Sequence, residues 1–412
     1  DPNLFTASVV VINGSSDTNS KEVYKGNDVT FTITPNDGYT LEDASISCSN
    51  GTLSNNLLTI SNVQSDITCT ITLDEDGITL VQAMLRDNPT ISERTSFSST
   101  NVANTTGTIY KTNKTEDGSE VYYYSGNTTN NWVYFGGFYW RIIRTNEDGS
   151  VRMLYSGTSH DTTEGYIGTS AYNNSYKNPM YAGYMYGTGD SLENNRTNIN
   201  DSTIKTYIDN WYEKNLLTNY DKYISKTAIY CNDRSIGSGR YNTSSKVGNK
   251  FYFASYTRLK TNKAPSYKCG ANISNGLIES NQATEDKFSA NTTGGGNGQL
   301  KYPVALMTAD EVSFAGGVYD IELSVPYSYY SLNSNGSSIT ELNWWLLSSS
   351  DRTSSGSSVF YVQDSNYLGC LFSRFVSQAF AVRPAISLSS CVKVTGDGIP
   401  TDPYIVTKSS CN

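Results

Sequence analysis

Residues 344–388 read WWLLSSSDRTSSGSSVFYVQDSNYLGCLFSRFVSQAFAVRPAISL. Both ends of this stretch are apolar, at residues 344–347 and again at residues 381–388. Short apolar runs of this kind are typical of buried strands. The sequence therefore predicts two framework strands with a different kind of segment between them.

The middle of the stretch, residues 348–380, mixes charged, aromatic and small polar residues and follows neither the strand period nor the helix period. Loops carried by rigid strands hold many binding residues, because they tolerate substitution without loss of the core. We therefore interpret residues 348–380 as an irregular binding surface. A plain solvated meander of short strands is the alternative interpretation, and the pattern leaves both open.

The composition favours an all-β extracellular protein. Charged residues make up 17% of the 412 residues, aromatic residues make up 12%, and the formal net charge is -9. The chain has no cluster of Lys and Arg residues, which sequence-independent binding of nucleic acid requires. Because no run of about 20 apolar residues occurs, we expect neither a membrane span nor a signal peptide, and membrane contact only through an anchor outside residues 1–412.

Seven cysteines allow three local pairs and leave one residue over. This number and spacing of cysteines is typical of proteins in an oxidising compartment, although a sequence alone does not fix the disulfide connectivity. The pairs are Cys48 with Cys69, Cys231 with Cys269, and Cys391 with Cys411, and the residue left over is Cys370.

The N-terminal part predicts a small β-sandwich at residues 1–75. Five short alternating segments lie between residues 7 and 73, and in one of them Val29, Phe31 and Ile33 share a face. Residues 76–104 follow as a linker with a short helix that Pro89 ends.

The second domain is predicted at residues 105–412. Residues 138–144 and 151–155 form two strands joined by a turn, and the alternation in the first strand indicates a sheet partly covered on both faces. Ser202 caps one short helix, and Thr308 with Glu311 forms a capping box at the start of another. The fold class we expect is α+β and mostly β.

The motifs WWLLS and AVRPAISL resemble the end of C-type-lectin-fold proteins related to the formylglycine-generating enzyme. More narrowly, the segment is similar to bacterial surface proteins whose variable segment is rewritten by a diversity-generating retroelement. The run GNDVTFTITPNDGYTLEDASISCSNG resembles immunoglobulin-like repeats of the internalin B-repeat type. These resemblances imply an immunoglobulin-like stalk and a C-type lectin fold domain with two short helices.

In that family the adenine-directed changes never create Lys, Glu, Met or Trp codons, and none of these four residues occurs at positions 346–388. Gln363 and Gln378 fall outside the codons that the process allows, so they require another origin. We also expect Val359, Phe360 and Val362 to be core. Gly369, Leu371, Val376 and Arg383 are expected to be framework.

By resemblance to the family pattern, sixteen positions are expected to touch a ligand. They are Asp351, Arg352, Thr353, Gly356, Ser358, Tyr361, Gln363, Asp364, Cys370, Phe372, Ser373, Arg374, Phe375, Ser377, Gln378 and Phe380.

The function we expect is ligand binding at a cell surface, as a receptor-binding protein or adhesin. The expected partner is an unknown protein or glycan on another cell or a phage, with no nucleic acid, no cofactor and no metal site. A fixed cell-envelope or glycan-binding protein is the alternative. An oxidase or hydrolase has less support, because His160 is the only histidine and Cys370 has no evident partner.

Overall fold

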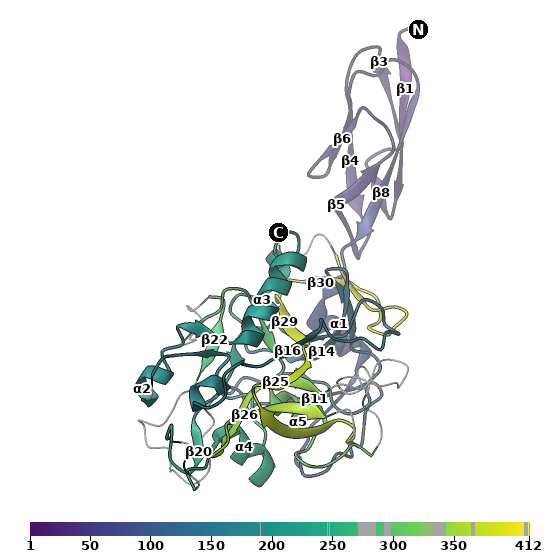
Figure 1. Ribbon diagram of the computed structural model, residues 1–412. Coiled ribbons are helices and arrows are strands. Elements are labelled where there is room, and N and C mark those ends of the chain that lie inside the picture. Colours follow the sequence, from purple (N-terminus) through teal and green to yellow (C-terminus); the bar gives the residue numbers. More distant parts are fainter. Residues whose placement is uncertain are drawn as a thin grey trace. The chain divides into compact units, whose positions relative to one another are not determined.

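The computed structural model describes residues 1–189, 191–244, 246, 248–270, 286–291, 298–324, 327, 330, 343–363, 367–407 and 411. The chain divides into two compact units. The first consists of residues 1–79, 391–395 and 406–412, and the second of residues 80–390 and 396–405. Strands outnumber helices in the described residues, which confirms the mostly β, α+β class (Figure 1).

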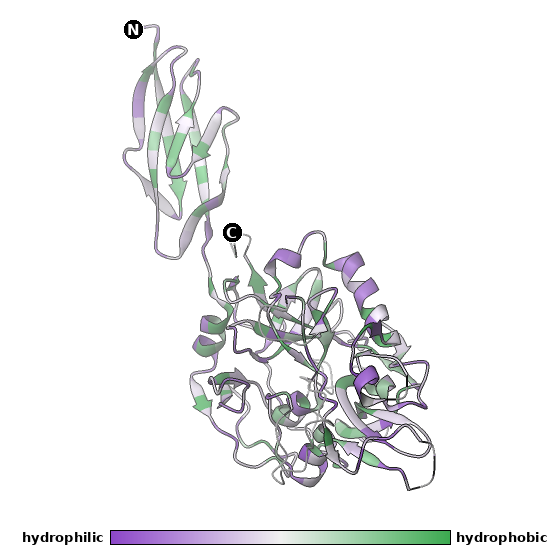
Figure 2. Cartoon of the chain, turned by 90° about the vertical axis from the view of Figure 1, so that its left-hand side faces the viewer, coloured by the Kyte–Doolittle hydropathy of each residue, from purple (hydrophilic) through white to green (hydrophobic). Residues whose placement is uncertain are grey.

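Two sheets pack over a shared apolar core in the first unit. One has the strand order β3-β1-β8-β5 and the other has the order β2-β4-β7-β6. Val29, Phe31 and Ile33 are buried in this core, as predicted. Figure 2 shows hydrophobic and hydrophilic stretches alternating along these strands. The strands are β1 Leu4–Ile12, β2 Gly14–Ser16, β3 Ser20–Tyr24, β4 Val29–Pro35, β5 Tyr39–Ile46, β6 Gly51–Ser54, β7 Leu57–Ile60 and β8 Ile67–Glu75.

The C-terminal tail groups with the first unit, which differs from the predicted second domain at residues 105–412. Strand β30 (Lys393–Thr395) pairs with β9 (Ile78–Thr79), and a disulfide joins Cys391 to Cys411. The strand pair joins residues more than 300 positions apart in sequence, so the local pattern did not indicate it, whereas the disulfide joins residues only 20 positions apart.

The largest sheet of the second unit contains the predicted pair of strands, β14 and β15. Its strand order includes β10-β11-β12-β14-β13-β31, β15 pairs with both β14 and β29, and β24 pairs with β29. Strand β14 is buried over most of its length, as the sequence predicted. The strands are β10 Thr90–Ser92, β11 Thr108–Thr112, β12 Val121–Tyr123, β13 Trp132–Phe135, β14 Phe138–Thr145, β15 Val151–Tyr155, β24 Val304–Leu306, β29 Pro384–Leu388 and β31 Tyr404–Val406.

A second sheet contains most of residues 344–388. Its strand order is β16-β28-β25-β21-β20, and β26 pairs with β25 and β27. Every residue of β25 is buried, and so is every residue of β29 in the larger sheet, which confirms both framework strands. The strands are β16 Thr169–Ala171, β20 Ile236–Ser238, β21 Phe251–Phe253, β25 Trp344–Arg352, β26 Ser357–Gln363, β27 Cys370–Phe375 and β28 Ala379–Ala381.

The irregular character predicted for residues 348–380 is wrong for most of this segment. Strands β25, β26 and β27 form an antiparallel meander, with register shifts between Trp345 and Asp351 where β25 pairs with β26. All of β25 and all but the last residue of β26 are buried. A strand covered on both faces has no need of polar residues at every second position, so its sequence lacks the strand period.

The two helices predicted for the second domain begin at the expected caps, whereas the short α2 and α4 were not predicted. Ser202 caps α3 through a hydrogen bond from the Lys205 amide, and the Thr308–Glu311 capping box opens α5. The helices and smaller strands are α1 Leu80–Asp87, α2 Leu192–Asn195, α3 Thr203–Asn215, α4 Ala254–Tyr256, α5 Ala309–Ala315, η1 Pro179–Ala182, η2 Asp221–Tyr223, η3 Thr257–Thr261, β17 Met185–Tyr186, β18 Asn200–Asp201, β19 Tyr230–Cys231, β22 Lys287–Ser289 and β23 Gly298–Gln299.

The three disulfides are the ones that spacing favoured, joining positions 48 to 69, 231 to 269 and 391 to 411. Cys370 is a buried free thiol. Three disulfides in one chain indicate an oxidising, extracellular environment. Among the described helices, none has the length and apolar character needed to cross a bilayer.

Candidate functional site

Strand β27 carries the part of the expected ligand surface that remains accessible. It lies at the border of its sheet, paired along its length with β26 and bridged at Leu371 to Tyr319. We define the β27 strip as those of the sixteen expected contact residues on this strand and on the segment that follows it that are partly or fully exposed. They are Phe372, Ser373, Arg374, Phe375, Ser377, Gln378 and Phe380.

An aromatic cluster underlies one side of the β27 strip. Tyr361 pairs with Phe372 across β26 and β27, and its ring centroid lies 4.9 Å from that of Phe380. Phe380 in turn lies 4.5 Å from the buried Trp345, and Phe372 stacks on Tyr319 at 5.4 Å. The strip aromatics therefore rest on buried rings, which limits the motion of their exposed faces.

Six of the sixteen expected contact residues are buried, so their side chains are not accessible to a ligand in this structure. They are Asp351, Arg352, Gly356, Ser358, Tyr361 and Cys370. Thr353 and Gln363 are half-buried near the ends of β25 and β26, and Asp364 lies outside the described residues.

A distant segment, residues 176–182, contacts β25 and β26 and accounts for the burial of Arg352 and Gly356. Arg352 donates a hydrogen bond to the Lys177 carbonyl at 2.7 Å and is 1% exposed. Ser357 donates to the Asn178 carbonyl at 3.0 Å. A Cβ on Gly356 would come within 2.6 Å of the Tyr176 ring, so only glycine fits there. Arg352 and Gly356 therefore belong to the framework.

Burial also changes the pKa values of Asp351 and Cys370. Burial raises the pKa of the Asp351 carboxyl, which accepts a hydrogen bond from Ser350 at 2.9 Å. Burial likewise raises the pKa of the Cys370 thiol to about 11, so the group stays protonated at neutral pH. A protonated, covered thiol is a poor nucleophile.

A charged cavity of about 470 Å³ lies elsewhere in the second unit. Its walls come from β14, β15, the start of α5 and the connections around residues 227–233 and 266–267. Pockets of a few hundred cubic ångströms are the usual size for small-molecule sites. The sequence did not predict this cavity.

The floor of the charged cavity is a buried ionic triad. Arg144 on β14 and Arg152 on β15 are cross-strand partners. Both donate to Oε1 of Glu311, at 3.0 Å and 2.7 Å respectively. Burial alone would raise the pKa of Glu311, but Arg152 and Arg144 outweigh it and hold the pKa below its ordinary value of 4.5. Glu311 is therefore ionised between two like charges that would otherwise repel.

A second buried pair extends the floor. Arg258 forms a two-point contact with Asp310, with both N–H···O distances at 2.7 Å, and reaches Asp233 at 3.4 Å. Planar guanidinium groups suit such two-point contacts with carboxylates. With the triad, this gives three guanidinium groups facing three carboxylates.

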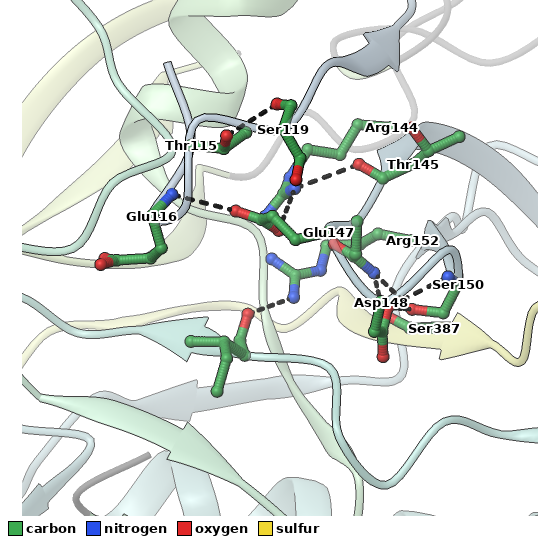
Figure 3. Close-up of polar contacts among 12 residues, drawn as sticks. Thr115, Glu116, Ser119, Arg144, Thr145, Glu147, Asp148, Ser150, Arg152 and Ser387 are labelled. Atoms are coloured by element: carbon green, nitrogen blue, oxygen red, sulfur yellow. Dashed lines mark hydrogen bonds and ion pairs between the residues drawn. The ribbon is translucent and has the colours of Figure 1, made fainter. Parts of the chain in front are cut away.

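The mouth of the cavity is more acidic. Glu116 pairs with Lys287 at 2.9 Å, and Glu147 reaches Arg144 at 3.4 Å. Figure 3 shows Glu147 extending toward Arg144, and it shows Asp148 beside Ser150. Burial alone would raise the pKa of Asp148, but Ser150, Thr227 and Ser225 donate hydrogen bonds that lower it.

Two signals in the sequence point toward the cavity. Arg144 lies in a strand whose neighbours are apolar, and Glu311 completes a capping box. An arginine in a buried strand requires carbonyl or carboxylate acceptors, because an unpaired buried charge is costly. The partner lies 167 residues away, so only the fold identifies it.

Acidification is expected to destabilise the second unit through Glu311. Because its folded pKa lies below 4.5, its contribution is complete above about pH 4.5 and is lost as the pH falls through the folded pKa. Urea unfolding measured from about pH 6 to about pH 3 should show this loss, and Glu311→Gln should have a shallower acid slope. Equal slopes in the two proteins would contradict the assignment.

Residues 186–390 match the family model described as Domain of unknown function (DUF6273). The match includes α5 and strands β25, β26 and β27, so it spans the β27 strip and part of the cavity wall. No curated protein and no solved structure matches the chain.

Proposed function

We propose that the chain is an extracellular, surface-displayed ligand-binding protein of the receptor-binding or adhesin type. In this proposal the second unit is a C-type lectin fold domain of the kind diversified by retroelements, and the β27 strip meets the ligand. The first unit, an immunoglobulin-like module, serves as a stalk. The disulfides support an extracellular setting, and the motifs WWLLS and AVRPAISL support the family.

The observation that carries the proposal is the contrast between the β27 strip and the strands beneath it. Phe372 and Phe380 present partly exposed rings that pack on buried aromatics, and the neighbouring Arg374 is exposed. Rigid aromatic faces combined with an adaptable arginine are characteristic of binding hot spots. The buried strands tolerate changes in the strip because the strip adds little to the core.

Binding arrays of surface glycans and bacterial surface proteins test the proposal. The wild-type chain should bind at least one arrayed molecule, and Phe372→Ala with Arg374→Ala should weaken that binding about tenfold or more. The reason is that the half-buried Phe372 and the exposed Arg374 are both removed while the core is kept.

Tyr134→Ala is the matched control, because Tyr134 is an exposed aromatic on β13, in the other large sheet. It should bind as the wild type does. Equal weakening by Tyr134→Ala, full binding by the double variant, or no bound molecule on either array would contradict the proposal.

A further inference from the structure

The charged cavity is separate from the β27 strip. Its walls come mainly from β14, β15 and α5, whereas the strip lies on β27 and the segment after it. At about 470 Å³ the cavity is large enough for a molecule the size of a monosaccharide or a short diamine. A ligand there would be recognised by chemistry unrelated to the strip aromatics.

Charge is distributed unevenly between the floor and the mouth. The floor is balanced, since its three guanidinium groups face three carboxylates. At the mouth four carboxylates, those of Glu116, Asp117, Glu147 and Asp148, face one ammonium group, that of Lys287. The cavity therefore attracts positive charge at its opening and offers neutral hydrogen bonding below.

Asp148 differs from Glu116 and Glu147 because no ion pair among the described residues neutralises it. It accepts hydrogen bonds from neutral side chains: the hydroxyl of Ser150 at 2.5 Å, and those of Ser225 and Thr227 at 2.8 Å. These donors fix the carboxylate in place and keep it ionised, but they bring no positive charge. A protonated amine in the cavity would supply it.

Asn146 adds an independent observation. The Ser150 hydroxyl gives its proton to Asp148, so its oxygen accepts from Nδ2 of Asn146 at 2.8 Å, and Nδ2 also lies 3.1 Å from the Ser387 hydroxyl. This arrangement fixes the orientation of the amide. Oδ1 of Asn146 is then a buried acceptor with no hydrogen-bond partner among the described residues, although Asn146 lines the cavity and is 5% exposed.

Buried polar atoms in native proteins nearly always have a partner, so an orphaned acceptor at a cavity indicates a missing donor. On the floor, Nε of Arg152 is likewise buried without a partner among the described residues. The cavity thus lacks a donor at Asn146 and an acceptor at Arg152. A molecule with an N–H group and an oxygen atom would satisfy both.

We propose that the charged cavity binds a small organic cation, a molecule with a protonated amine and a neutral, hydroxylated or short aliphatic body. The ammonium group pairs with Asp148 and Glu147 at the mouth, and the body occupies the space above the Arg144–Glu311–Arg152 triad. The site requires no contribution from the β27 strip.

Paired probes test the role of the positive charge. Glucosamine is compared with glucose, and putrescine with 1,4-butanediol, by thermal shift and calorimetry at low salt. At least one amine should raise the Tm saturably while its neutral partner at the same concentration does not. Equal effects within both pairs, no effect of either amine, or stabilisation by Ca²⁺ alone would overturn the proposal.

Asp148→Asn tests where the ammonium group binds, because it removes the negative charge of the side chain and keeps its shape. It should weaken amine binding about tenfold, which corresponds to about 1.4 kcal/mol. Glu147→Gln serves the same purpose if Asp148→Asn does not fold. Asp161→Asn is the matched control, since Asp161 is an exposed aspartate that also bonds to a serine two residues away, Ser159.

The Asp161→Asn control should bind the amine as the wild type does. If it weakens amine binding as much as Asp148→Asn does, only general surface charge is involved and the proposal is overturned. Phe372→Ala should leave amine binding unchanged. Failure of the β27 strip to bind a macromolecule and failure of the cavity to bind an amine are therefore separate outcomes.

Discussion

Replacing Glu311 with alanine is expected to lower the free energy of unfolding by about 3 to 5 kcal/mol, because a buried pair that loses one partner leaves uncompensated charge. Here the loss would leave Arg144 and Arg152, both at most 4% exposed, facing each other across neighbouring strands. It would also remove half of the capping box that opens α5. Urea unfolding followed by circular dichroism measures the change.

Glu213→Ala is the matched control for this prediction. Glu213 lies on the exposed side of α3 and pairs with Lys301 at 3.3 Å. Because both side chains are about half exposed, the pair should contribute about 1 kcal/mol or less. A loss for Glu311→Ala no larger than that of Glu213→Ala would show that the triad is not an important part of the fold.

Trp345→Ala is expected to destabilise the second unit by about 3 to 5 kcal/mol, the usual range for a fully buried tryptophan. Trp345 is completely buried, and its indole N–H donates to the Ser170 carbonyl at 3.0 Å. Its ring also supports Phe380 at 4.5 Å and Tyr361 at 6.3 Å. The substitution therefore leaves a cavity beneath the β27 strip.

Phe372→Ala provides the comparison, because Phe372 is only half-buried and lies on the strip itself. It should cost about 1 kcal/mol or less. Urea unfolding of both variants measures the two values. Equal destabilisation would mean that the strip and its supporting strands form one core, and the division between binding surface and framework would be wrong.

The framework was predictable from the sequence because local patterns determine it. Val29, Phe31 and Ile33 alternate with polar residues and face the core of the first unit. Thr308 and Glu311 have the spacing of a capping box, and they form one. In each case the signal lies within a few residues of its consequence.

The sequence could not show which residues of the expected binding surface are accessible, because their burial depends on distant residues. Nothing in residues 348–380 indicates that the chain near Tyr176 and Lys177 covers Arg352. The charged cavity was not predictable for the same reason, since Arg144 and Glu311 meet only through the packing of α5 against a sheet. Contacts between distant segments decide both cases, and a single sequence does not reveal them.

The most direct measurement is to sequence the DNA beside the gene and look for a second copy of the codons for residues 344–388 near a reverse transcriptase. We expect a copy that differs at adenines only, with the differences confined to accessible positions. These are Thr353, Phe372, Ser373, Arg374, Phe375, Ser377 and Phe380.

Positions buried beneath residues 176–182, such as Arg352 and Gly356, should be identical in the two copies. Differences at these buried codons would contradict the division between strip and framework. The lack of any second copy, together with an unchanging segment in sister strains, would contradict the diversified surface itself and favour a fixed adhesin or envelope protein.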